Sequence, residues 1–182
     1  MSTSTLITAE EYLLHADSGR PTELVEGIIR AMNPPGFRHG QICNTIGRLL
    51  GNFVDEHECG RVVSNDSGVI TRRDPDTVRG ADVAYYSYET VPRDHTPEGY
   101  PPGPPDIVFE VLSPSDQRSG IDQKVDEYLQ AGVAVVCVVD DRGKVVTIHR
   151  CEQDAQVLGE AEEMTLPGVL PGFVVAVSKL FA

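Results

Sequence analysis

The sequence predicts an α/β (α+β) fold in which helices pack on a mixed β-sheet. Apolar residues recur at helical spacing in three segments, and short runs rich in β-branched residues lie between them. The two kinds of segment alternate in the order α-β-β-α-β-β-β-α-β-β, which is typical of helices layered on one sheet. The chain has 182 residues, and we expect residues 1–182 to form a single domain.

The N-terminal third is expected to hold two helices with a hairpin between them. Thr8 is a predicted N-cap with Glu11 three residues later, a capping-box pattern before a short amphipathic helix. "TELVEGIIRAM" predicts two short strands around the Glu26-Gly27 turn. A second helix is predicted from about His39 to Glu56, because its apolar residues recur at helical spacing: Ile42, Ile46, Leu49, Leu50 and Phe53.

The middle of the chain predicts two strands and a long loop. "GRVVSNDSGVIT" and "GADVAYYS" are predicted strands, separated by the turn-rich "RRDPDTVR". The proline-rich segment 91–105 is too polar and too often interrupted for regular structure. Long loops of this kind often serve function, so we expect it to form a flap beside a site.

The C-terminal part adds strands and one more helix. "DIVFEVLSPSD" begins as a buried strand, a helix is predicted from about Gly120 to Ala131, and "VAVVCVVD" is a further strand. "KVVTIHR" is expected to pair with that strand through the turn "DDRGK". The tail "MTLPGVLPGFVVAVSKLF" predicts one short strand and a terminal helical turn.

Composition excludes several classes of protein. No apolar run approaches the roughly 20 residues of a membrane span, and the N-terminus has no signal-peptide pattern, so we expect a cytoplasmic protein. The four cysteines lie far apart without C-x-x-C spacing and are expected to be reduced core residues. The five histidines form no H-x-x-x-H pair, which argues against a zinc site.

The net charge of −13 bears on the choice of partner. Proteins that bind nucleic acid usually present a basic surface, because contacts to phosphates supply much of the affinity. The acidic balance argues against tight binding along an extended DNA track. A metal-dependent enzyme is still compatible with a phosphate substrate, because bound divalent ions reverse the local sign of the field.

Glu110 is the most informative residue, because it stands inside an apolar strand. An ionised carboxylate costs several kcal/mol to bury unless a partner neutralises it. Asp82 lies in the strand "GADVAYYS", and if the two strands are neighbours the two acids converge. Two acids that close repel unless a cation lies between them, and Mg²⁺ favours such an all-oxygen environment.

The helix that follows supplies a candidate cation. Lys124 lies on the flank of the apolar stripe formed by Ile121, Val125, Tyr128 and Leu129, from where its stem can lie on the sheet. Two acids, a metal ion and a lysine suit the hydrolysis of a phosphodiester. The ion activates water and polarises the phosphoryl group, while the lysine stabilises negative charge that develops in the transition state.

Each of these residues also has a purely structural interpretation. Glu110 is explained equally well as a buried acid tied to an arginine. Asp82 is compatible with a turn at the start of its strand, and Lys124 with a solvated helix flank. His39 is compatible with a simple helix-entry role. Of Glu23 and Glu26, which alternate along the hairpin, only one can face inward.

At these residues the chain resembles the putative restriction endonuclease family often called Uma-two, of the PD-(D/E)XK nuclease-like superfamily. The similarity rests on "GADVAYYS", on "PPDIVFEVLSPSDQRSGIDQKVDEYLQAGV" and on the N-terminal "TELVEGIIRAMNPPGFRHGQI". It extends from about Leu6 to the C-terminus. Two differences from the family pattern are Ala81 where a proline is expected, and Val136-Cys137 where an aromatic pair is expected.

The resemblance implies a restriction-endonuclease-like core of the αβββαβ type and Mg²⁺- or Mn²⁺-dependent DNA cleavage. It makes Asp82 and Glu110 the metal-binding acids, with the main-chain carbonyl of Val111 as a further ligand. It gives Lys124 the lysine role, moved from the strand to the helix because Leu112 occupies the E-x-K position. It also implies roles for two N-terminal residues, Glu23 as the inward acid of the hairpin and His39 as the histidine at the start of the second helix.

Three hypotheses follow for function. The first is a metal-dependent DNA endonuclease, expected to act as a homodimer because a two-fold dimer brings two sites to two strands. The second, motivated by the charge of −13, is a nuclease-like module that binds or assembles without cleaving. The third is hydrolysis of smaller phosphate esters, which needs the same site but no basic DNA track.

Overall fold

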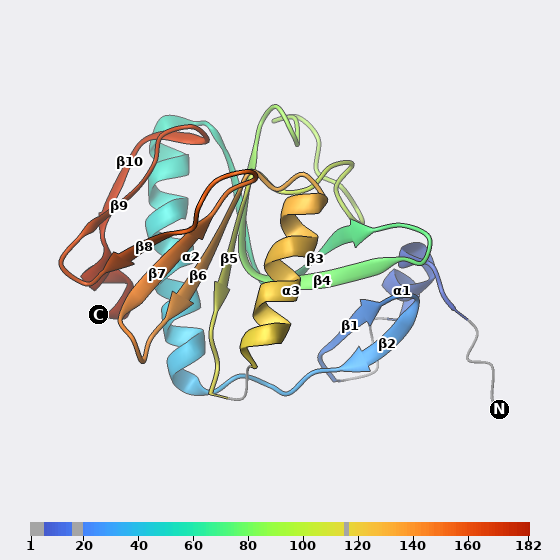
Figure 1. Cartoon of the computed structure of the whole chain (residues 1–182). Coiled ribbons are helices and arrows are strands. Elements are labelled where there is room, and N and C mark those ends of the chain that lie inside the picture. The colour runs from blue at the N-terminus through green and yellow to red at the C-terminus, as the bar shows by residue number, and fades with distance from the viewer. Residues whose placement is uncertain (1–5, 16–19, 115–116) are drawn as a thin grey trace.

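The computed structural model describes residues 6–15, 20–114 and 117–182, and in these ranges one mixed eight-stranded sheet carries helices on both faces (Figure 1). The elements, in chain order, are α1 (Ala9–His15), β1 (Thr22–Val25), β2 (Ile28–Ala31), α2 (Phe37–His57), β3 (Gly60–Arg72), β4 (Thr77–Ser87), β5 (Ile107–Val111), α3 (Arg118–Gln130), β6 (Val135–Asp140), β7 (Val145–His149), β8 (Gln156–Gly159), β9 (Glu163–Leu166), β10 (Leu170–Ala176) and the 3₁₀ helix η1 (Val177–Phe181).

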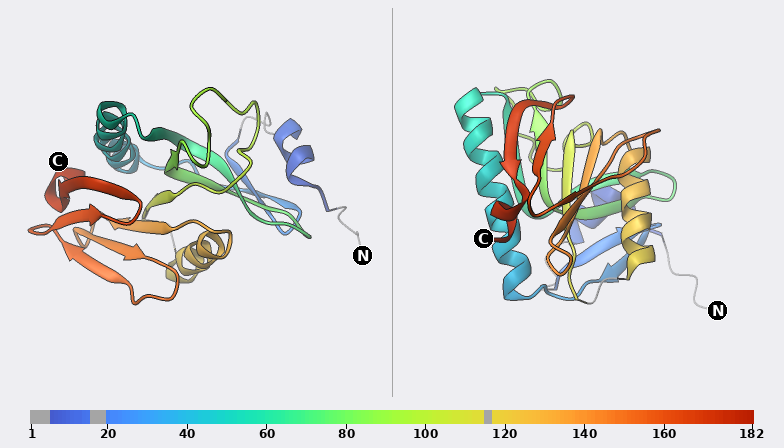
Figure 2. Two further views of the ribbon diagram at one scale, coloured as in Figure 1. Left: turned by 90° about the horizontal axis from the view of Figure 1, so that it is seen from above. Right: turned by 60° about the vertical axis from the view of Figure 1, so that its left-hand side comes forward.

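The sheet separates two apolar layers. Its strands follow the order β2-β1-β4-β5-β6-β7-β8, with β3 paired to β4. Seen from above, α2 and α3 lie on opposite sides of it (Figure 2). The α2 side is the larger core, and it includes Ile46, Leu50 and Phe109 together with the C-terminal hairpin β9–β10. The α3 side packs Val125 and Tyr128 against Val108 and neighbouring strand residues.

The sheet forks along one edge of β4. Strand β3 pairs with the other edge over the whole length of β4, from Ser87 to Thr77. On the forked edge β1 pairs at Val78, and β5 pairs from Val83 to Tyr85. No described strand pairs with residues 79–82 on that edge, and we call these four residues the fork. Backbone groups at such a gap need partners other than a neighbouring strand.

Most predicted elements are present at the expected places. The capping box is confirmed, because the Thr8 backbone N–H donates to Glu11 Oε2 at 2.8 Å and the Glu11 N–H donates to Thr8 Oγ1 at 3.2 Å. The β1–β2 hairpin turns at Glu26 and Gly27, both of which have positive φ. Helices α2 and α3 each extend about two residues beyond the predicted starts.

The predicted boundary of the central hairpin was wrong. Strand β4 begins at Thr77 and not at Gly80, and β3 continues to Arg72, so only residues 73–76 remain as the turn. Thr77 and Val78 are buried and pair with Arg72 and Ile70, which stabilises the longer hairpin. Asp82 therefore lies in the middle of a strand and not near its start.

The C-terminal region holds more strand than predicted. Strand β8 was not predicted, and the tail forms two strands, β9 and β10, before η1. Met164, Leu166, Leu170 and Phe173 are buried against the α2 side of the sheet, which explains why the hairpin folds onto it. The terminal helical turn was predicted and is present.

Two expectations from composition can be compared with the structure. All four cysteines are free, but only Cys137 is fully buried, whereas Cys43 and Cys59 are half-buried and Cys151 is exposed. The expectation of four core cysteines was therefore wrong for Cys151. Within the described ranges, no helix combines the length and the apolar character needed to cross a membrane.

Candidate active site

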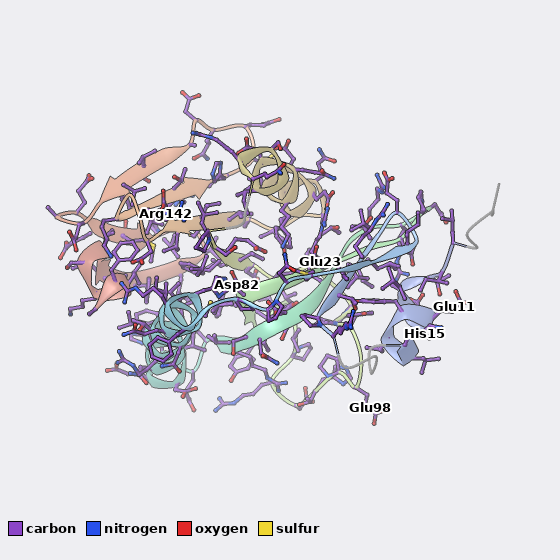
Figure 3. The ribbon with its side chains drawn as sticks, turned by 90° about the horizontal axis from the view of Figure 1, so that it is seen from below. Glu11, His15, Glu23, Asp82, Glu98 and Arg142 are labelled. Carbon is purple, nitrogen blue, oxygen red and sulfur yellow. The ribbon has the colours of Figure 1, made fainter. Side chains whose placement is uncertain are left out.

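A cleft of about 490 Å³ opens at the fork. Its lining includes six chargeable residues, namely His39, Asp66, Arg79, Asp82, Glu110 and Lys124. From below, Asp82 and Glu23 lie in the middle of the molecule, between α2 and α3 (Figure 3). The fold thus gathers side chains from both helices and from β1, β4 and β5 at one place.

Asp82 and Glu110 lie on adjacent strands, just beyond the end of the β4–β5 ladder. The last pair of the antiparallel β4–β5 ladder is Val83 with Phe109. Asp82 precedes Val83 and Glu110 follows Phe109, so the two acids lie next to each other where the ladder ends at the fork. Both residues are buried, at 8% and 4% exposure. Asp82 Oδ2 accepts a hydrogen bond of 2.6 Å from the Val111 N–H, so this carboxylate satisfies backbone that a neighbouring strand leaves unpaired.

Glu110 is held by two donors from α3. The Tyr128 hydroxyl donates to Glu110 Oε1 at 2.7 Å, and Lys124 Nζ lies 3.4 Å from Oε2. Burial raises the pKa of Glu110 well above its usual value, the Lys124 charge opposes this, and the nearby Asp82 charge adds to it. The carboxyl group therefore lies in an environment that a further cation would make more favourable to its charged form.

Lys124 is bound more closely to Glu23 than to Glu110. Its Nζ is 2.9 Å from Glu23 Oε1, and its side chain is 14% exposed. Burial alone would lower the pKa of Lys124, but the charges of Glu110 and Glu23 raise it, so the ammonium stays charged. The lysine stem lies over the sheet as the sequence predicted, and the solvated-flank interpretation is wrong.

Arg79 anchors the other side of Glu23. Its Nη1 donates to Glu23 Oε2 at 2.8 Å, and its Nε and Nη2 bind Glu127 of α3 at 2.6 and 2.9 Å. The Gly80 N–H donates to Glu23 Oε1 at 3.2 Å, which satisfies another backbone group of the fork. An arginine does neutralise a buried acid here, but the acid is Glu23 and not Glu110.

The hairpin places Glu23 inward and Glu26 outward. Glu23 is 5% exposed, whereas the Glu26 side chain is 63% exposed and pairs with Arg72 at the surface. The inward position of Glu23 agrees with the position that the family pattern implies for it.

His39 faces Asp82 from the first turn of α2. Its Nε2 is 3.3 Å from Asp82 Oδ2, and its Nδ1 is 3.4 Å from Cys43 Sγ. The hydrogen bond to Asp82, with a smaller effect of Cys43, raises the pKa of His39 to about 10. The histidine therefore carries a positive charge beside Asp82, which a simple helix-entry residue would not require.

Two residues that line the cleft, and one beside it, were missed by the sequence analysis. Arg79 was assigned to a turn, and Cys43 to the core. Asp66 lies in a bulge of β3 between Ser64 and Ser67, where Asn65 and Asp66 both have positive φ. The bulge turns Asp66 over Gly80, where an added Cβ would lie 2.9 Å from Asp66 Cβ. Only a glycine fits at position 80 under this bulge.

The proline-rich loop lies elsewhere. None of the described residues that line the cleft comes from segment 91–105, whereas Tyr100 and its neighbours line a second cavity beside Leu13 of α1. Glu98, in this loop, lies far from Asp82 in Figure 3. The expectation of a flap beside the site was wrong for the cleft at the fork.

Replacing Tyr128 by phenylalanine is expected to destabilise the fold by about 1.5–3 kcal/mol, because it removes a buried hydrogen bond to a chargeable carboxyl. Urea unfolding measures the loss. Tyr12→Phe is the matched control, since the Tyr12 hydroxyl donates to the neutral carbonyl of Thr22 at 2.6 Å. An equal or smaller loss for Tyr128→Phe than for Tyr12→Phe would show that the Tyr128–Glu110 bond has no special role.

Comparison with known proteins relates this chain to one family and one solved structure. The sequence matches the Uma2 family, described as "Putative restriction endonuclease", over residues 9–178. This chain belongs to the Uma2 family. Among solved structures, a protein of Anabaena variabilis described as a putative nuclease belonging to DUF820 has 19% sequence identity and a TM-score of 0.80. The alignment covers 96% of this chain and 97% of that one.

These comparisons confirm the family and the fold. The Uma2 match covers nearly the whole chain, and the shared architecture confirms the predicted nuclease-like, mixed-sheet class. No curated protein matches the sequence. Family and fold together support a nuclease, and the structure adds a candidate metal-ligating group, His39, Cys43 and Asp82.

Proposed function

We propose that this Uma2 protein is an endonuclease that uses Mg²⁺ or Mn²⁺ to hydrolyse phosphodiester bonds in DNA. The observation that carries the proposal is the pair of buried acids, Asp82 and Glu110, side by side at the fork with Lys124 next to them. Family membership and fold add independent support for nuclease chemistry.

The acid pair fits a hard divalent ion. Both groups offer carboxylate oxygens, which Mg²⁺ prefers, and both line an open cleft that water can enter. Burial raises the pKa of Glu110 and the Asp82 charge adds to this, although Lys124 opposes it, so a bound cation would favour the charged form of the carboxyl group. Asp82, Glu110 and the main-chain carbonyl of Val111 would hold the ion. When bound, it would supply an activated water and polarise the phosphoryl oxygen.

The other residues receive roles from their contacts. Lys124 brings a permanent positive charge to the cleft, where it would stabilise the charge that develops on the phosphate in the transition state. Glu23 positions that ammonium, and Arg79 in turn holds Glu23. His39 faces Asp82 and would orient its carboxylate.

One observation, the net charge, favours two alternatives to DNA cleavage. The net charge of −13 favours a smaller phosphate ester, or a module that binds without cleaving, over an extended DNA track. DNA is proposed as the substrate because the family is described by endonuclease activity.

Cleavage assays distinguish these functions. We expect supercoiled plasmid to be nicked or linearised with Mg²⁺ or Mn²⁺ and to stay intact with excess chelator. Lys124→Gln is expected to lower the rate by roughly a hundredfold or more, as the loss of a transition-state contact does. Hydrolysis of a small phosphodiester without plasmid cleavage would favour the ester hydrolase. If neither substrate is hydrolysed and Mn²⁺ binding releases no heat, the hypothesis of a module that binds without cleaving is supported.

The assembly is part of the same proposal. We propose that residues 1–182 act as one restriction-endonuclease-like domain, in the cytoplasm, and pair as a two-fold homodimer. Sedimentation velocity at micromolar concentration should give the mass of a dimer, and a monomer mass with full cleavage activity would contradict the pairing.

A further inference from the structure

His39, Cys43 and Asp82 form a compact group at one end of the cleft. His39 and Cys43 are one turn apart on α2, and Cys43 Sγ is 3.4 Å from His39 Nδ1. On the other side of the ring, His39 Nε2 is 3.3 Å from Asp82 Oδ2. One ligand atom from each of the three residues lies within 4.8 Å of the others. Such mutual distances allow three ligands to reach one ion after small side-chain adjustments.

The chemistry of this group differs from that of the acid pair. Mg²⁺ prefers oxygen ligands, whereas a nitrogen, a sulfur and an oxygen together suit Zn²⁺, which tolerates all three. We propose that His39, Cys43 and Asp82 form a second divalent-cation site, selective for a thiophilic ion such as Zn²⁺, that shares Asp82 with the acid pair. On binding, the Cys43 S–H bond breaks and sulfur ligates the ion as a thiolate. The ligating ring nitrogen of His39 also gives up its proton, and both protons pass to solvent.

The surroundings of Cys43 suit this role. The thiol is half-buried and packs beside the α2 core, so it is shielded yet adjacent to the cleft that His39 and Asp82 line. The Asp66 carboxylate lines the same cleft and adds negative charge near an incoming cation. Three protein ligands leave the fourth tetrahedral position of Zn²⁺ open to water.

The lack of an H-x-x-x-H pair argued against a zinc site, but it left a mixed histidine–cysteine pair out of consideration. The spacing H-x-x-x-C of His39 and Cys43 places two ligands on one helix face in the same way. Because the Asp82 carboxylate is common to both sites, occupation by Zn²⁺ would withdraw it from the acid pair. The second site would therefore inhibit the proposed hydrolysis, although its existence does not depend on that activity.

Cobalt spectroscopy tests the site on the full-length protein. Co²⁺ replaces Zn²⁺ and gives a thiolate-to-metal charge-transfer band only when sulfur is a ligand. We expect the band in the unmodified chain and in Glu110→Gln, which disables only the acid pair. Cys43→Ser should abolish the band and weaken Co²⁺ binding by at least roughly a hundredfold, since even outer-shell losses reach 10–100-fold. Cys59→Ser should keep the band, because Cys59 is also half-buried but follows the C-terminal end of α2, away from His39.

A second measurement needs no variant. Zn²⁺ should slow alkylation of Cys43 in the unmodified chain, whereas Mg²⁺ should not, with peptide mass spectrometry as the readout. The proposal is overturned if the unmodified chain gives no charge-transfer band, if the band persists in Cys43→Ser, or if Zn²⁺ leaves the alkylation rate of Cys43 unchanged. None of these outcomes depends on cleavage. A failure of the metal-site proposal can therefore be told apart from a failure of the nuclease proposal.

Discussion

Replacing Glu110 by glutamine is expected to abolish Mg²⁺ binding and to lower the cleavage rate by at least roughly a hundredfold. This factor is the lower end of the rate loss seen when one contact to the transition state is removed. The substitution removes the charge but keeps the shape, and the amide oxygen can still accept the Tyr128 hydrogen bond. Titration calorimetry with Mg²⁺ and a plasmid assay under the same conditions measure the two effects.

The matched control for this substitution is Glu26→Gln. Glu26 belongs to the β1–β2 turn, forms its own ion pair with Arg72 and has a side chain that is 63% exposed. It should bind the ion and cleave as the unmodified chain does. Equal heats of Mg²⁺ binding and equal cleavage rates for Glu110→Gln and the unmodified chain would remove Glu110 from the proposed chemistry.

Replacing Arg79 by methionine is expected to destabilise the protein by about 3 kcal/mol. Loss of one partner from a buried ion pair costs about 3–5 kcal/mol because the remaining charge is left uncompensated. The lower figure applies because Lys124 still neutralises Glu23 at 2.9 Å. Methionine retains most of the apolar stem, so the loss reports on the guanidinium and not on packing.

Arg72→Met provides the comparison. Arg72 and Arg79 both lie on the β3–β4 hairpin, and each binds a glutamate of the β1–β2 hairpin, at 2.9 and 2.8 Å. The Arg72 pair is exposed and should contribute less than about 1 kcal/mol. Urea unfolding of both variants gives the difference, and equal losses would contradict the assignment of Arg79 as the buried anchor of the site.

The acid pair was predictable because a charge inside an apolar strand is a strong local signal. Glu110 stands among Val108, Phe109 and Val111, and all four residues are buried. A strand at the surface would not carry such a continuous apolar run around one acid. The position of Lys124 was also predictable, because helical spacing places it beside Val125 and Tyr128. For these residues, periodicity alone determines which way the side chain points.

The positions of Arg79, Asp66 and Cys43, in or beside the cleft, depend on information that local patterns lack. Arg79 becomes buried only because β4 begins three residues earlier than expected, through pairing with β3. Asp66 faces the cleft because of a bulge with positive φ at two non-glycine residues, which no periodicity forecasts. Cys43 becomes a candidate ligand only together with Asp82, and it is the folded sheet that brings Asp82 close to α2.

Strand β8 was missed for a related reason. Leu158 is its only fully buried residue, so the segment shows no alternation of apolar and polar side chains. Its place in the sheet comes from pairing with β7, where Val146 is opposite Leu158. A short strand at an edge takes its structure from its neighbour more than from its own sequence.

The most direct test of the central claim is a crystal structure of the protein soaked in Mn²⁺. We predict anomalous density between the carboxylates of Asp82 and Glu110, within bonding distance of both, with Lys124 still beside Glu110. Well-ordered crystals with no density between these two carboxylates, or with the ion bound to a group that excludes Glu110, would contradict the proposed hydrolytic centre.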